Sequence, residues 1–368
     1  PFYILCGVLM NTGGIAQKLI DFAKILVGRI PGGLAHTNIL GNTLFGSLSG
    51  SSVAASVAIG GVLIPMEEKE GYDKKFAAAV NIASAPTGLI IPPSGILIIY
   101  PVLAGCSVVG MIMSGYIPGL MWALACMVVA YVIAKKNHYP TAGKVPASVF
   151  FKYFVDAIPS LLLIVIIVGG VMSGIFTATE SAAVAVAYTL FLSIVVYRSI
   201  KIKDLPKILL DACETTAIIM FLIAGSNVMS FVMSFTGLPS AIGNALISVS
   251  SNKYVILLII NLVLLVVGCF MDITPAVLIF TPIFLPVVQS FGMDPIHFGI
   301  MMVMNLGIGN ITPPVGSALF SGCSVADMDM EDMIKPILPF YAAIFVALML
   351  VAYVPWFSMA LPTLFGAV

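Results

Sequence analysis

Two proline pairs interrupt apolar sequence in this chain, and they constrain its fold more than any other feature. They stand in PTGLIIPPSG (86–95) and NITPPVG (310–316). Proline removes a backbone hydrogen bond and ends or kinks a helix. The chain is 60% hydrophobic and 9% charged, so polar side chains cannot cover it as they cover a soluble globule. We expect an all-α integral membrane protein in which two helices break inside the membrane.

Both breaks belong to an internal repeat. Residues 63–95 align with residues 284–316 at a constant offset of 221 positions, which pairs Gly88 with Gly309 and one proline pair with the other. Each of the two repeats is therefore expected to contain the same kind of broken helix.

Each break follows a second irregularity, a group of polar, turn-forming residues centred in an apolar stretch. These groups are GSLSGSS in 33–66 and MDIT in 254–291. The apolar arms on either side have about a dozen residues, too few to span a bilayer. We expect two re-entrant helical hairpins at 33–66 and 254–291. The broken helices follow them at 74–104 and 296–325.

The count of crossings makes the two repeats inverted relative to each other. We expect four spans between them, near 111–134, 158–176, 181–197 and 209–235, and a last span near 338–360. The basic residues support this topology, since fifteen fall on one predicted face and Lys253 alone on the other. Positive charge concentrates on the cytoplasmic side. The first hairpin is therefore predicted to open from the cytoplasm, the second from outside, and the C-terminus to be periplasmic.

Inverted repeats with broken helices are typical of secondary transporters, whose site lies where the breaks and hairpin tips converge. The chain opens without a methionine, and we expect it to lack an N-terminal portion. The predicted domains are scaffold or arm helices at 1–30, a first transport repeat at 31–108, scaffold helices at 109–208, a second transport repeat at 209–325 and a C-terminal scaffold helix at 326–368.

An unwound segment frees carbonyl oxygens that suit a small, hard cation, and the half-helix after it presents N–H groups to an anion. Hydroxyl groups near the tips and breaks can complete the coordination of the cation or the hydrogen bonding of the anion. They belong to Ser49, Ser51, Ser52, Thr274 and Thr312. Three histidines, His36, His138 and His297, have no partner at metal-ligand spacing, and we expect them in loops or at the membrane interface.

Few acids lie inside apolar sequence. Asp272 is at the second tip. Burying an ionisable side chain in the membrane costs free energy, so such a residue is expected to be functional, although Asp272 could also cap the helical arm that follows it. Glu180 stands three residues after Thr177, the spacing of a capping box, and we interpret it as structural. Asp211 and Glu214 are interpreted as acids that open a cytoplasmic helix.

Several motifs together resemble one family. They are GSLSGSSVAASVAIG, PTGLIIPPSG, GIFTATESAAVAVAY, MDITPAVLIFTPIFLPV and GIGNITPPVGSALFSGCSVA, in this order. They are similar to the large membrane subunit of tripartite ATP-independent periplasmic (TRAP) transporters, the DctM-like proteins. The resemblance implies an elevator-type, sodium-driven importer of organic acids in the bacterial inner membrane, and not an enzyme. It also implies two partners, a small DctQ-like membrane subunit and a periplasmic DctP-like binding protein.

Carried over by position, the resemblance also implies roles for single residues. One sodium site would use Ser49, Ser51, Gly88, Ile91 and Pro93, and the other Thr274, Gly309, Thr312 and Val315. The substrate would be bordered by Ser49, Ser52, Asp272 and Asn310. Sialic acid is the expected substrate, ahead of a C4-dicarboxylate.

Three alternatives remain open on the sequence. The driving ion could be a proton that binds at Asp272. A passive channel would also use hairpins and freed carbonyls. An intramembrane serine hydrolase would pair Ser51 or Ser52 with His36, which lies about four helical turns away and makes a poor dyad.

Overall fold

The computed structural model describes residues 1–141, 147–237, 241–242, 245 and 252–367, and within these ranges the chain contains no strand. Seven helical segments there are long and apolar enough to cross a membrane. Six of them lie between the two broken helices: the four predicted spans and the two arms of the second hairpin. Each of these arms has 18 residues, so the expectation that the arms are too short to span a bilayer is wrong for the second hairpin. Lys144 and most of residues 236–253, which connect the fourth of the predicted spans to the second hairpin, lie outside the described residues.

The helices are α1 (Phe2–Thr12), α2 (Ile15–Val27), α3 (Gly33–Ser49), α4 (Ser52–Lys69), α5 (Lys74–Ser84), α6 (Thr87–Ile90), α7 (Ile96–Ala104), α8 (Val108–Ser114), α9 (Tyr116–Lys136), α10 (Ala147–Ile164), α11 (Gly170–Met172), α12 (Ala178–Phe191), α13 (Leu205–Thr236), α15 (Lys253–Phe270), α16 (Ile273–Ser290), α17 (Pro295–Gly309), α18 (Ser317–Val325), α19 (Met330–Tyr353) and α20 (Trp356–Leu364).

The first repeat is a helical hairpin followed by a helix in pieces. Arms α3 and α4 pack against each other and turn at Gly50, whose φ of +63° lies in the left-handed region that glycine adopts without strain. The broken helix is α5, α6 and α7, with an irregular segment between Ile90 and Ile96 that contains the proline pair.

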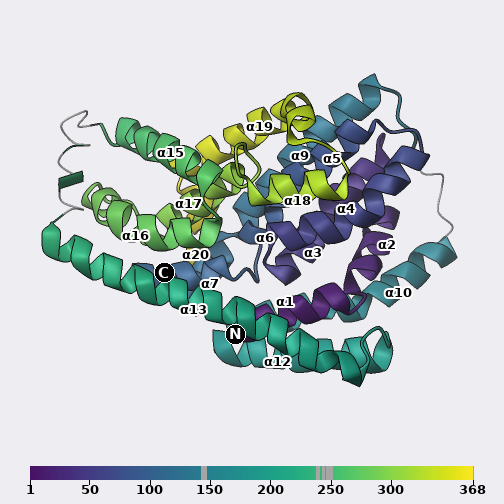
Figure 1. Cartoon of the computed structure of the whole chain (residues 1–368), viewed down its shortest axis with the longest axis horizontal. Helices are drawn as coiled ribbons and strands as arrows, with labels where there is room; N and C mark the ends of the chain where they lie inside the picture. The colour runs from purple at the N-terminus through teal and green to yellow at the C-terminus, as the bar shows by residue number, and fades with distance from the viewer. Residues whose placement is uncertain (142–146, 238–240, 243–244, 246–251, 368) are drawn as a thin grey trace.

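The second repeat has the same plan. Arms α15 and α16 turn at Met271–Asp272, and the broken helix is α17 and α18. Matched aspartates start the two broken helices: Asp73 accepts a hydrogen bond from the Lys75 amide at 3.2 Å, and Asp294 accepts one from the Ile296 amide at 2.7 Å. In Figure 1 the α15–α16 hairpin extends from the left-hand end toward the middle, whereas α3 and α4 lie to the right of the middle.

Each hairpin crosses its broken helix at a pair of glycines. A Cβ atom on Gly88 would lie 2.3 Å from the Cα of Gly46, and one on Gly309 would lie 2.4 Å from the Cα of Gly268. No other residue leaves room for backbones this close. These crossings hold each hairpin tip beside its break.

The first halves of the broken helices form the centre of the molecule. Every residue of α17 from Ile296 to Gly309 is buried. The Tyr100 hydroxyl of α7 donates to the Pro295 carbonyl at 2.6 Å, so the two repeats pack directly against each other. Helix α13 runs along the lower edge in Figure 1, next to α1, which it contacts together with α16.

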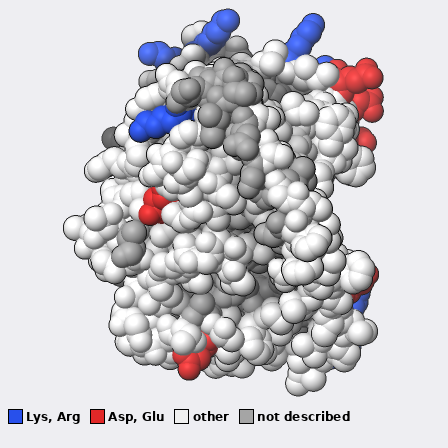
Figure 2. All heavy atoms as spheres, turned by 90° about the vertical axis from the view of Figure 1, so that its left-hand side faces the viewer, with Lys and Arg blue, Asp and Glu red and all other residues white. Residues whose placement is uncertain are grey.

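Two expected spans differ in extent from the observed helices. The span expected at 158–176 begins earlier and ends at Met172. The last span, expected at 338–360, ends at Tyr353, and α20 is a separate helix because the chain turns at Val354–Pro355. Figure 2 looks at the end of the molecule that carries α15 and α16. Most of that surface shows no charged side chain, and most Lys and Arg side chains in view project from its upper edge.

Candidate functional site

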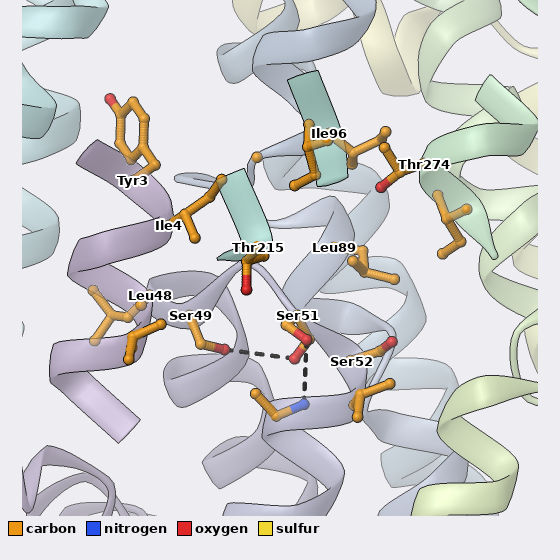
Figure 3. A pocket seen from close by; sticks show the side chains of 18 of the residues that line it. Tyr3, Ile4, Leu48, Ser49, Ser51, Ser52, Leu89, Ile96, Thr215 and Thr274 are labelled. Atoms are coloured by element: carbon orange, nitrogen blue, oxygen red, sulfur yellow. Dashed lines mark hydrogen bonds between the residues drawn. The ribbon is translucent and has the colours of Figure 1, made fainter. Parts of the chain in front are cut away.

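A cavity of about 480 Å³ lies where the two hairpin tips meet. Its walls come from both tips, from α1, α7 and α13, and from Asn310 in the second break. All four residues predicted to border a substrate, Ser49, Ser52, Asp272 and Asn310, line this one cavity. Figure 3 shows the serines of the first tip, Thr274 of the second hairpin and Thr215 of α13 around it.

The first tip brings the start of α4 to the cavity. Ser51 caps this helix, and its Oγ accepts a hydrogen bond from the Ala54 amide at 3.2 Å. The Ser49 hydroxyl lies 3.5 Å from the Ser51 carbonyl (Figure 3). A helix N-terminus carries partial positive charge, so this tip can face an anion.

The second tip brings the start of α16 to the same cavity, but here the acid does not cap. Asp272 occupies the position before α16 and makes no side-chain capping bond. The interpretation of Asp272 as a cap is therefore wrong. Its carboxylate instead accepts a hydrogen bond from the Ser317 hydroxyl at 3.1 Å.

Asn310 joins the two repeats. Its side-chain amide donates to the Ser52 hydroxyl at 2.7 Å, across 258 positions of sequence. Its side-chain oxygen accepts from Ser317, the residue that also reaches Asp272. Ser317 has one hydroxyl proton, so it donates to Asn310 or to Asp272 at any one time. These polar side chains nevertheless lie next to one another from the first tip through the second break to the second tip.

The predicted ligands of the first sodium site, which come from the first tip and the first break, fall into two groups. Ser49, Ser51 and Pro93 line the cavity, whereas Gly88 and Ile91 are buried behind it. Ser94 was missed by the sequence reasoning, although it directly follows the proline pair. Its hydroxyl is buried and has no hydrogen-bond partner among the described residues. An unpaired buried hydroxyl is costly, so this group is available to a ligand inside the break.

Of the predicted ligands of the second sodium site, Thr274 of the second hairpin lines the cavity. The others, Gly309, Thr312 and Val315, belong to the second break and are not part of the cavity lining. The Thr312 hydroxyl donates to the Ile308 carbonyl at 2.7 Å, which leaves its lone pairs free to accept or to bind a cation. The Val315 amide donates to the Cys269 carbonyl at 3.1 Å and ties the break to the hairpin. The Ile311 carbonyl already accepts from the Tyr341 hydroxyl.

The other acids fall into two classes. Glu180 forms the predicted capping box with Thr177: its carboxylate accepts from the Thr177 amide at 2.8 Å. The interpretation of Asp211 and Glu214 as helix-opening acids is wrong, because α13 begins at Leu205 and has no acid in its first turn. Asp211 lines the cavity instead.

Two histidines are buried rather than in loops or at an interface. His36 lies within α3, and His297 lies within α17, where its Nδ1 is 2.6 Å from the Ser358 hydroxyl. No group of three or more potential metal-binding His, Cys, Asp or Glu side chains occurs in the part of the chain that the structure describes. The cavity is lined by hydroxyl groups and by the two carboxylates of Asp211 and Asp272, which are oxygen ligands of the kind a hard cation prefers.

Residues 1–357 match the family model "Tripartite ATP-independent periplasmic transporter, DctM component". The chain is 52% identical to YgiK of Salmonella typhimurium, which is described as uncharacterized, over all of this chain and 84% of that protein. It is 39% identical to the C4-dicarboxylate TRAP transporter large permease protein DctM of Pseudomonas aeruginosa, over 100% of this chain and 86% of that one. It is also 39% identical to the sialic acid TRAP transporter large permease protein SiaM of Vibrio cholerae, over 99% of this chain and 86% of that one.

Proposed function

Because the chain belongs to the DctM component family, the large permease subunits of TRAP transporters, we propose that it couples sodium entry to the import of an organic acid anion across the bacterial inner membrane. The observation that carries this proposal is the single cavity shared by the tips of two repeats. In a secondary transporter, such convergence marks the site of substrate and ions.

The charges around the cavity favour sodium as the driving ion. None of the described residues that line it is basic, and two of them, Asp211 and Asp272, are acidic. An organic anion needs positive charge nearby, which helix N-termini supply only in part. Cations bound at the two breaks would supply the rest. Ser94 offers a free hydroxyl for one of them, in addition to the predicted ligands.

The proposed mechanism is an elevator. The two hairpins would be re-entrant and would move with the broken helices past fixed scaffold helices. The hydrogen bond from Asn310 to Ser52 supports this, because it joins the first tip to the second break, and Ser317 lies between that break and Asp272 at the second tip. A proton carried by Asp272 is the competing driving ion.

The family is tripartite, and we propose a DctQ-like and a DctP-like partner for this chain. The proposed substrate is sialic acid, since one relative is named for it. C4-dicarboxylates are the alternative, after the name of another relative.

Sodium dependence of uptake by ligand variants tests the proposal. Thr312→Ala and Ser51→Ala each remove one proposed oxygen ligand and should raise the sodium concentration for half-maximal uptake by about tenfold, the effect of losing roughly 1.4 kcal/mol of binding. Ser321→Ala is the matched control, because its hydroxyl also bonds back to its own helix, to the Ser317 carbonyl at 2.6 Å. Uptake that ignores sodium in the unmodified protein would contradict the proposal, and a dependence of uptake on pH that is lost in Asp272→Asn would then favour protons.

A further inference from the structure

One face of α13 forms the cavity wall opposite the hairpin tips. Asp211, Thr215 and Ile219 follow one another at four-residue spacing, so they share this face. Figure 3 shows Thr215 on the side of the cavity that faces Ser49 and Ser51. We call Asp211 and Thr215 the α13 wall. The sequence did not mark either residue as part of a site.

The α13 wall offers hydrogen-bond acceptors. The Asp211 carboxylate is exposed to the cavity, and among the described residues no hydrogen bond or ion pair engages it. The Thr215 hydroxyl donates to the Asp211 carbonyl at 2.9 Å, which leaves its lone pairs for a ligand. An ionised aspartate accepts and never donates. A ligand that touches this wall must therefore bring its own O–H or N–H groups.

The opposite side of the cavity suits a carboxylate. The N-terminal ends of α4 and α16 meet there. The proposed cation sites of both breaks lie on this side too, and their cations would offset the charge of Asp272, whereas no proposed cation lies beside Asp211. The two sides of the cavity therefore suit different chemical groups. A ligand can place a negatively charged group at the hairpin tips and O–H or N–H donor groups at the α13 wall.

A plain dicarboxylate does not match this division. Its second carboxylate would lie toward Asp211, with no basic side chain among the described lining residues to pair with it. Like charges repel, most strongly in a site with little water. An acid with several hydroxyl groups would instead donate to Asp211, a charge-assisted hydrogen bond of the stronger kind. The volume of about 480 Å³ accommodates such a molecule.

We infer that the α13 wall selects polyhydroxylated monocarboxylates, the sugar-acid class, over dicarboxylates. This inference rests on the proposed function and makes Asp211 and Thr215 specificity-determining residues.

Ligand binding by the purified membrane complex in nanodiscs tests the inference, because the periplasmic protein is then absent and cannot filter substrates. Calorimetric titrations use gluconate and sialic acid as hydroxylated monocarboxylates and succinate as the dicarboxylate. Each titration is made in sodium chloride and again in potassium chloride. We expect at least one hydroxylated acid to bind about tenfold or more tightly than succinate, and only in sodium.

Two variants and two matched controls assign the preference to the wall. Asp211→Asn removes the charge while it keeps the shape, and Thr215→Val removes the hydroxyl. Each should reduce the preference for the hydroxylated acid by about fivefold or more. Glu214→Gln and Thr216→Val are the controls on the same helix, since neither residue lines the cavity and Thr216 also bonds back to its helix. Both controls should keep the preference of the unmodified protein.

The outcomes separate the two proposals. Sodium-dependent binding of succinate that equals or exceeds that of both hydroxylated acids overturns the inference and leaves the sodium-coupled function intact. A preference that Asp211→Asn and Thr215→Val leave unchanged also overturns it. Binding that is the same in potassium as in sodium contradicts the proposed function itself.

Discussion

At the scale of single residues, the meeting of four polar positions in one cavity could be predicted, and the wall opposite them could not. Ser49, Ser52, Asp272 and Asn310 stand inside broken apolar sequence, where polar residues are rare and conspicuous, and they line one cavity. Asp211 carries no such local signal. Its place depends on how α13 packs across the tips, which is a long-range contact that helical spacing alone does not reveal.

Asn310→Ala tests the link between the repeats. The change removes the bond to Ser52 and leaves that buried hydroxyl unpaired, so we expect a loss of about 1–3 kcal/mol in stability and weaker substrate binding. The melting temperature of the purified complex, with and without sodium, measures the loss. Asn137→Ala is the control, since this exposed side chain makes only a 3.4 Å contact with the Tyr139 hydroxyl. Equal melting temperatures for both variants would show that the link does not hold the tips together.

At the scale of elements, the bounds of the hairpins and breaks were predicted to within a few residues, because proline and glycine act locally. The length of the hairpin arms was not, since the helical arms have 17 or 18 residues rather than about a dozen. The expected broken helix 74–104 corresponds to α5–α7, and 296–325 corresponds to α17–α18. The glycine crossings were not foreseen. Gly46 and Gly268 resemble many other glycines in this sequence, and only the packed structure shows which of them touch another backbone.

Substitution at the crossings should be costly. Gly88→Ala and Gly309→Ala would each place a methyl group within 2.4 Å of backbone atoms that cannot rotate away, and such overpacking costs about 1–3 kcal/mol or more. Lower melting temperatures and lower yields of folded protein are expected. Gly61→Ala is the matched control on the hairpin arm α4, because its new methyl group would meet only Val325, at 3.9 Å. If all three variants have the same melting temperature, the backbones at the crossings are less closely packed than the structure indicates.

At the scale of the whole molecule, the inverted topology follows from the crossing count and the distribution of basic residues, and it remains a prediction. The structure describes two repeats of the same plan. The side on which each hairpin opens therefore depends on the positive-inside rule.

Cysteine labelling in intact cells tests that topology. Lys69→Cys and Lys253→Cys place exposed thiols at the bases of the first and second hairpins. The background should lack the six native cysteines, of which Cys213 is exposed. A membrane-impermeant maleimide should label position 253 from outside, and position 69 only after the membrane is opened. Labelling of both from the same side would contradict inverted repeats.

The central claim is that the two broken helices use sodium to carry an organic acid. Uptake of radiolabelled sialic acid into proteoliposomes that contain the complete transporter, with its binding protein outside, tests this most directly. A sodium gradient, a potassium gradient and a proton gradient are imposed in turn. The account predicts accumulation above equilibrium with the sodium gradient alone, and faster uptake when the interior is negative. Sodium-independent accumulation driven by the proton gradient would contradict it.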